Sequence, residues 1–174
     1  MKNLLFVLML SCLGGGLQAQ QKKATLPPAP KKIDYKKKGA PLPPFRIDKT
    51  AGGVLTNANL KSGKPVMVMI FSPQCDHCEH MMDSLKQVSD LFHATQLLLV
   101  AEDRNKEHMK GFIKKTDIGT HPLFQQIGTN KGELIFSIYT YKILPQVNIY
   151  DSRHRLVRTL DGNFPFDSLK MFIQ

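Results

Sequence analysis

The sequence lacks the features of several common functional classes. It contains no tryptophan and only three cysteines among 174 residues, and aromatic residues make up 8%. No apolar run approaches the roughly eighteen residues of a membrane-spanning helix. There is no glycine-rich phosphate loop, no pair of catalytic carboxylates and no internal repeat. The length fits one globular domain with a tail.

The positive charge lies mostly in one segment. The net charge is +10, and Gln20–Pro44 alone holds seven lysines and one acid. From Phe45 to the end, 16 Lys and Arg face 13 Asp and Glu, a net of +3. The compact part is therefore only mildly basic, and we predict no nucleic-acid partner. Six prolines share the segment with the lysines, so we expect an extended, solvated linker over residues 20–44. Such a Lys/Pro tail could also tether the protein to an anionic membrane surface.

Residues 1–19 have the features of an export signal. Lys2 is followed by the apolar stretch Leu4–Leu10, three glycines and small residues up to Ala19. We predict a signal peptide cleaved after Ala19 and a periplasmic location. Cys12 offers an alternative, because its surroundings loosely resemble a lipoprotein cleavage site. Lipidation there would anchor the protein, with the Lys/Pro segment as a stalk.

The other two cysteines, Cys75 and Cys78, form a C-x-x-C pair. A disulfide between them would close a loop of only four residues and contribute about 2 kcal/mol to stability, which is little for a structural disulfide. Before the pair, Pro65–Phe71 is wholly apolar and indicates a strand buried on both faces. After it, apolar residues recur with the spacing of one helix face. They are Cys78, Met81, Met82, Leu85, Val88 and Phe92.

This placement predicts different roles for the two cysteines. Cys75 lies where a strand meets a helix N-terminus, whose free N–H groups and dipole favour a thiolate. We therefore expect Cys75 to be the exposed attacking thiol. Cys78, one turn further on the apolar face, should be shielded and resolve the mixed disulfide.

Other uses of the cysteines fit less well. Covalent haem attachment needs C-x-x-C-H, and Glu79 occupies the histidine position. Zinc could draw on Cys75, Cys78, His77 and His80, but these side chains point in different directions within one helical turn. No second Cys/His pair stands elsewhere, so we predict no metal site. An inert structural bridge stays open as an alternative.

The remaining segments complete an α/β pattern. We expect a strand at Gln96–Ala101 and a helix at Asn105–Lys115, with Asn105 as its N-cap. Leu123–Ile127 suggests a short helix, and Leu134–Ile143 is ambiguous between helix and strand. Asp151–Arg155 reads as a turn between antiparallel strands, followed by a final helix from about Phe166.

Together these motifs resemble the thioredoxin-like superfamily, and most of all the exported TlpA/ResA-type thiol–disulfide oxidoreductases of Bacteroidetes-like bacteria. The resemblance covers about Pro43–Gln174. Its matching parts are Pro43–Ile47, Gly53–Leu60, Gly63–Val66, Phe71–Cys78, Ile143–Asp151 and Leu156–Leu160. It implies a three-layer α/β sandwich with a central mixed β-sheet over residues 45–174.

The resemblance also implies a substrate-binding loop. The proline matching Pro145 is cis in this superfamily and faces the C-x-x-C pair, and the residue matching Leu144 offers backbone groups to an extended substrate. A trans proline at a strand start is the alternative. No cofactor is implied, since electrons pass through the cysteines. The implied partners are proteins with thiols or disulfides and a membrane reductase that donates electrons.

Three departures from the family bear on activity. Gln74 replaces the tryptophan common before the first cysteine, and Met81 replaces a glutamate common in TlpA/ResA-type proteins. Met67 and Met69 stand in the strand where thioredoxins carry a buried acid. Four side chains remain candidates for the proton acceptor of Cys78: His77, Glu79, His80 and Glu102.

Asp76 and His77 lie between the cysteines and are the candidates for tuning the redox potential. A histidine directly before the second cysteine also occurs in strongly oxidising relatives. It predicts a potential less reducing than the roughly −270 mV of thioredoxin. A solvated His77 without effect is the alternative. We thus predict an exported protein disulfide oxidoreductase that acts mainly as a reductase; the alternative is a partner-binding module with little or no turnover.

Overall fold

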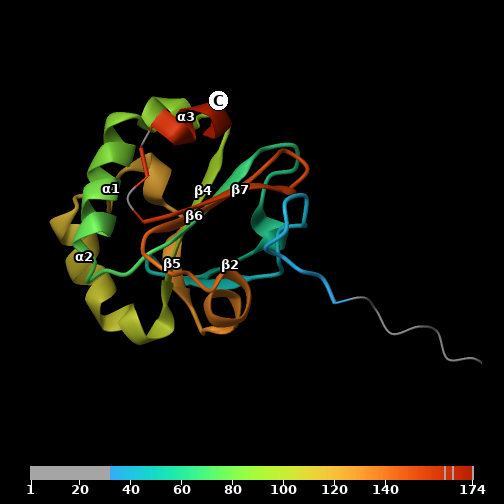
Figure 1. Ribbon diagram of the computed structural model, residues 1–174. Helices are drawn as coiled ribbons and strands as arrows, with labels where there is room; N and C mark the ends of the chain where they lie inside the picture. Colours follow the sequence, from blue (N-terminus) through green and yellow to red (C-terminus); the bar gives the residue numbers. More distant parts are fainter. Residues whose placement is uncertain (1–31, 163, 166, 174) are drawn as a thin grey trace, which may run out of the picture. The chain divides into compact units, whose positions relative to one another are not determined.

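The computed structural model describes residues 32–162, 164, 165 and 167–173. The chain divides into two units, Met1–Lys32 and Ile33–Gln174, and the helices and strands of the described residues lie in the second (Figure 1). The predicted signal peptide, the possible lipid site at Cys12 and residues 20–31 of the expected linker fall outside the described residues and stay predictions. Within the described part, no helix is long and apolar enough to cross a membrane.

Seven strands form one mixed sheet, in the order β2-β1-β5-β4-β3-β6-β7. The strands are β1 (Arg46–Lys49), β2 (Val54–Thr56), β3 (Val66–Ile70), β4 (Gln96–Glu102), β5 (Ile127–Asn130), β6 (Gln146–Tyr150) and β7 (Leu156–Asp161). The central three, β3, β4 and β5, are parallel, and the outer pairs are antiparallel. This confirms the expected mixed α/β sheet.

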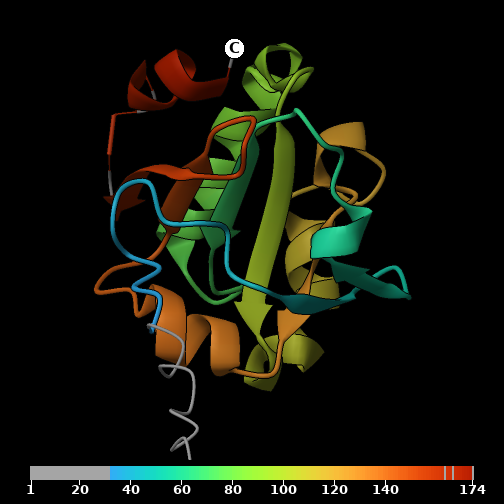
Figure 2. The same cartoon turned by 90° about the vertical axis from the view of Figure 1, so that its right-hand side faces the viewer.

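Helical segments cover both faces of the sheet and make three layers (Figures 1 and 2). The α-helices are α1 (Asp76–Gln87), α2 (Met109–Lys115) and α3 (Asp167–Ile173). Four short 3-10 turns are η1 (Asn57–Asn59), η2 (Ser89–Phe92), η3 (Asp103–His108) and η4 (Pro122–Phe124), and η5 (Glu133–Tyr139) is a wide π-type helix. Buried side chains of α1, α2 and α3 share one core, whereas η5 and the chain before β1 belong to the core on the opposite face.

Strand β3 explains why the sheet centre could be predicted. All five of its residues are buried. Met67 and Met69 pack in the core beneath α1, and Val66, Val68 and Ile70 pack in the opposite core. A strand with helices or loops on both faces needs an unbroken apolar run, which this one has.

Two local expectations need correction, and one ambiguous stretch is resolved. Asn105 is not an N-cap: the chain leaves β4 directly into η3, and the α-helix begins only at Met109. Asp103 is the first residue of η3, and its carboxylate accepts a hydrogen bond from the Thr129 hydroxyl at 3.0 Å. The short helix expected around Leu123–Ile127 ends at Phe124, and Ile127 opens β5. In the ambiguous stretch Leu134–Ile143, the residues up to Tyr139 belong to the helix η5.

The end of the expected linker packs on the domain. The Gly39 N–H donates to the Leu156 carbonyl, and the Leu156 N–H donates to the Ala40 carbonyl, both at 2.8 Å. The Leu42 N–H bonds the His154 carbonyl at 2.9 Å, and its side chain is buried. Residues 39–43 therefore belong with the domain, because their backbone pairs with the start of β7. The resemblance implies an opening strand at Pro43–Ile47, but β1 begins only at Arg46.

Candidate functional site

The two cysteines lie at the N-terminus of α1, just beyond the end of β3. Cys75 is the N-cap, with an extended backbone (φ −112°, ψ 113°). Its Sγ accepts the backbone N–H of Cys78 at 3.3 Å. This bond and the positive end of the helix dipole favour a negatively charged sulfur. Cys75 is half-buried and thus within reach of a partner.

Cys78 lies one turn into α1 and is completely buried. It belongs to the same apolar core as Met69, Phe71 and Met82. Burial is the main cause that raises the pKa of the Cys78 thiol far above its usual value, and the hydrogen bond with Cys75 raises it further. Both cysteines are free thiols. The pair thus has one accessible sulfur and one shielded sulfur, as the sequence predicted.

The predicted substrate loop lies against the pair. The Leu144–Pro145 peptide bond is cis, which confirms that expectation. The Cys75 thiol lies 3.9 Å from the Leu144 carbonyl oxygen. Strand β6 places the loop there, because Gln146 pairs with Ile70 at the end of β3. An extended chain that paired with Leu144 would bring a sulfur of its own close to Cys75.

Asp76 and His77 are exposed in the first turn of α1. His77 borders a hollow of about 300 Å³ beside Pro145. The other residues that line this hollow are His80, Met81, Ser84, Gly162, Phe164 and Pro165. The structure thus brings His77 and Pro145 to one groove and leaves Asp76 facing solvent.

The structure separates Glu102 from the other three candidate proton acceptors, which lie on α1. Glu102 lies in the core on the other face from Cys78, where its carboxylate accepts the Tyr141 hydroxyl at 2.7 Å and pairs with Arg104. Glu79 follows Cys78 on α1, and its negative charge is a minor cause of the raised pKa of the Cys78 thiol. Glu102 is therefore the least suitable of the four.

Sequence reasoning missed an ion pair beside the site. The Glu79 carboxylate is only 19% exposed and lies 2.6 Å from the ammonium of Lys115 at the end of α2. This hydrogen bond raises the pKa of Lys115. The pair joins two helices distant in the sequence, and no local pattern marks it.

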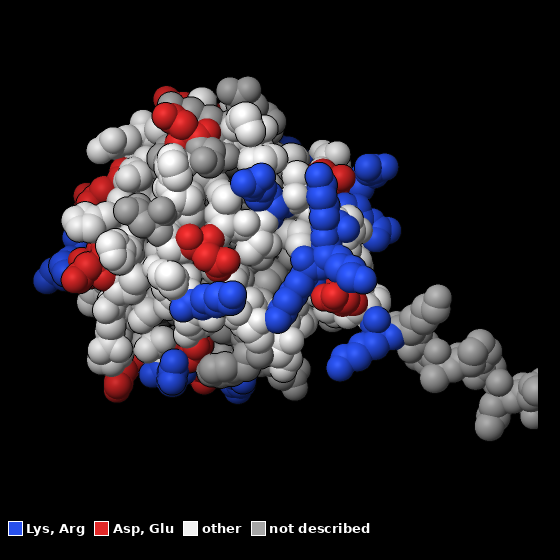
Figure 3. Space-filling model, in the orientation of Figure 1, with Lys and Arg blue, Asp and Glu red and all other residues white. Residues whose placement is uncertain are grey.

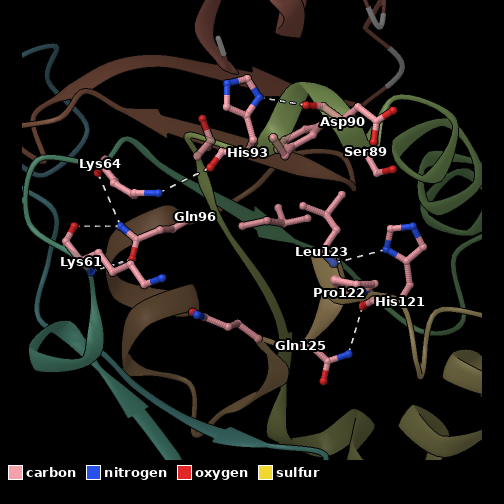
Figure 4. A pocket seen from close by; sticks show the side chains of 14 residues that line it. Lys61, Lys64, Ser89, Asp90, His93, Gln96, His121, Pro122, Leu123 and Gln125 are labelled. Atoms are coloured by element: carbon pink, nitrogen blue, oxygen red, sulfur yellow. Dashed lines mark hydrogen bonds between the residues drawn. The ribbon is translucent and has the colours of Figure 1, made fainter.

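A larger hollow than the one beside His77 lies elsewhere. It measures about 840 Å³ and surrounds the start of β4, whereas the cysteines follow the end of the neighbouring parallel strand. There the Gln96 side chain bonds the backbone of Lys61 and Lys64, as Figure 4 shows. It contains no cysteine, so cavity size does not locate the reactive pair. Within the described residues, no three His, Cys, Asp or Glu side chains converge as metal ligands would.

Comparison with known proteins decides the fold. No family model matches the chain, and no curated protein matches it in sequence. Solved structures do match. The thioredoxin domain of a thiol-disulfide oxidoreductase from Bacteroides vulgatus has a TM-score of 0.64 at 17% identity, over 79% of this chain and 99% of that one.

The chain has the thioredoxin-like fold. Two further solved structures are similar to the chain over most of its length. A secreted Mycobacterium tuberculosis disulfide oxidoreductase, homologous to E. coli DsbE, has a TM-score of 0.60 at 20% identity, over 74% of this chain and 93% of that one. StoA from Bacillus subtilis has a TM-score of 0.60 at 16% identity, over 78% and 99%. The thioredoxin-like fold predicted from the sequence is thus confirmed.

Proposed function

We propose that the protein is a thiol–disulfide oxidoreductase that exchanges electrons with the cysteines of other proteins. One observation carries the proposal: the accessible Cys75 sulfur caps a helix beside a cis-proline loop, with the Cys78 thiol buried beneath it. This arrangement gives one sulfur for attack and a second for release. The oxidoreductases among the similar solved structures support the same class of chemistry.

The first step forms a mixed disulfide. The substrate chain lies extended along Leu144 and Pro145, and the Cys75 thiolate attacks one sulfur of its disulfide. A bond forms between Cys75 and that sulfur. The other substrate sulfur leaves as a thiolate and takes a proton from solvent. Helix α1 stabilises the attacking anion through the Cys78 N–H.

The second step releases the substrate. Cys78 loses its proton and attacks the Cys75 sulfur, which forms the Cys75–Cys78 disulfide and expels the substrate thiolate. The substrate has gained two electrons and the protein has lost two. A dithiol donor must then reduce the pair, and a membrane reductase is the donor we propose. In the reverse direction the same steps oxidise a substrate dithiol.

Residues between the cysteines set the direction of this exchange. His77 is exposed next to Cys78 and beside Pro145. We propose that the imidazole of His77, with the carboxylate of Asp76 opposing it, adjusts the stability of the Cys75 thiolate and hence the redox potential.

We place the protein outside the cytoplasm, in the periplasm, either released after Ala19 or anchored through Cys12. The secreted state of the similar Mycobacterium protein agrees with export. The thiol substrates are then exported proteins that carry disulfides.

A partner-binding module with slow turnover is the second candidate. The observation that favours it is the apolar surrounding of Cys78, which includes Met67 and Met69. The buried acid that the described residues contain, Glu102, lies on the other face of the sheet. Deprotonation of Cys78 is then slow, and a mixed disulfide would persist. Such a protein would capture partners and release few.

Cysteine variants test the proposal. We expect Cys78→Ser to accumulate mixed disulfides with exported proteins, since the attacking sulfur remains and the resolving sulfur is gone. Cys75→Ser is the matched control and should trap none. The trapped species are counted on non-reducing gels with and without dithiothreitol. Equal trapping by both variants, or by neither, would contradict the assigned roles.

A further inference from the structure

A group of basic side chains lies on the face of the sheet opposite α1. Figure 3 shows Lys and Arg side chains gathered on its right-hand side, where Figure 1 has the chain before β1 and the β6–β7 turn. Lys38, Arg153 and Arg155 line a hollow of about 530 Å³ there, and the exposed Lys36 and Lys37 directly precede Lys38. These five residues are called the basic face below.

The fold holds this face in place. The chain after Lys38 is fixed to β7 by the two hydrogen bonds between Gly39, Ala40 and Leu156. The two arginines stand on the turn that joins β6 and β7. Because the backbone is ordered before any partner arrives, binding at this face costs little backbone entropy.

The nearby acids neutralise only part of the face. The Asp151 carboxylate accepts the backbone N–H groups of Arg153 at 2.9 Å and of Arg155 at 2.8 Å, so it serves the turn itself. It also lies 3.6 Å from the Arg153 guanidinium. Asp34 accepts the backbone N–H of Lys36 at 3.1 Å. In the described part of the chain, no acid forms an ion pair with Lys38 or Arg155.

The position of the face leaves the cysteines free. Leu42 and Leu156 beside it belong to one core, and Cys78 belongs to the core on the other side of the sheet. The β6–β7 turn also lies at the far end of the sheet, because Tyr150 pairs with Val66 at the start of β3. A large surface could cover the face while Cys75 stays open to substrates.

We infer that the basic face binds the domain to an anionic lipid bilayer. Clustered Lys and Arg are attracted to such a surface without shaped pockets. No aromatic side chain lines the hollow, whereas a protein partner or a single-stranded nucleic acid would use one as an anchor. The preceding chain adds charge of the same sign, at Lys22, Lys23, Lys31 and Lys32. The inference does not depend on the redox function.

The test compares two variants of the full chain that lose the same charge. K38Q/R153Q/R155Q removes three charges from the basic face, and K106Q/K110Q/K114Q removes three exposed charges from η3 and α2 on the other side of the sheet. Partitioning is measured by sedimentation with vesicles of phosphatidylcholine alone and with 30% phosphatidylglycerol. The ratio of the two partition coefficients isolates the charge effect, because apolar contacts by residues 1–19 contribute to both.

We expect the parent ratio to fall as salt rises, since the attraction is screened. Each charge near the surface contributes about five-fold, so the first variant should lose more than ten-fold and the second less than two-fold. Equal losses would mean that only net charge matters. If neither variant lost binding, the attraction would come from residues 1–32. If inorganic phosphate at matched ionic strength released the protein from the vesicles, the face would be a binding site for a free anion. Each of these three results overturns the inference, and none involves redox activity.

Discussion

At the scale of single residues, the positions of Cys75 and Cys78 fit the proposed order of attack by Cys75 and release by Cys78. One sulfur is accessible and accepts an N–H at the helix N-terminus, and the other is buried in an apolar core. The sequence predicted both placements, because the apolar spacing after Cys75 has the period of a helix. The contact of Glu79 with Lys115 could not be predicted, since it depends on how α1 and α2 pack.

The buried thiol predicts a pH dependence for substrate release. Its raised pKa means that Cys78 is protonated at neutral pH, and the reactive thiolate fraction grows about ten-fold per pH unit below that pKa. Release from a preformed mixed disulfide should therefore speed up about ten-fold per unit between pH 7 and 9. Single-turnover kinetics measure this rate. A flat profile would mean that a neighbouring base takes the proton within the site.

Substitution of His77 should change the redox potential of the Cys75/Cys78 pair. In its proposed role His77 stabilises the reduced pair. His77→Ala should therefore become more reducing, by about 30 mV for a tenfold effect on the equilibrium. Equilibration with glutathione redox buffers gives the value. Asp76→Ala is the matched control and should shift the potential in the opposite direction. An unchanged potential in His77→Ala would make His77 a solvated side chain without a tuning role.

At the scale of elements, the central strand and helix were predictable and one strand of the sheet was not. Strand β3 is an unbroken apolar run, and α1 has a clear apolar face. Strand β5 has the sequence Ile127-Gly128-Thr129-Asn130, with one apolar side chain, and is buried all the same. Its polar side chains find partners only in the folded sheet, since Asn130 donates to the Arg46 carbonyl at 2.8 Å.

A substitution at Gly128 tests how closely β5 packs on β1. A Cβ at this position would collide with the Asp48 carbonyl and lie 2.8 Å from Ile47 Cγ2. Gly128→Ala should therefore lower the free energy of unfolding by about 3 kcal/mol, as overpacking at a fixed backbone does. Urea titration measures it. Gly111→Ala on α2 is the control: its Cβ would meet nothing within 4 Å, and helix propensity predicts a gain of about 1 kcal/mol. Equal behaviour of the two variants would contradict the close approach.

At the scale of the whole molecule, the fold separates two surfaces. The cysteines, the cis-proline loop and α1 lie on one side, and the basic face lies on the other. The sequence showed that charge gathers before residue 45, but it placed Lys36–Lys38 in a free linker. It could not show that Gly39 and Ala40 pair with β7, because that contact joins segments far apart in the chain.

The most direct test of the central claim is the redox potential of the Cys75/Cys78 pair in the full chain, measured by equilibration with glutathione together with insulin reduction. The account predicts a reversible two-electron couple, less reducing than the roughly −270 mV of thioredoxin, with turnover of insulin disulfides. A pair that stays locked in one state, or that shows no turnover over hours, would contradict it and favour the binding module.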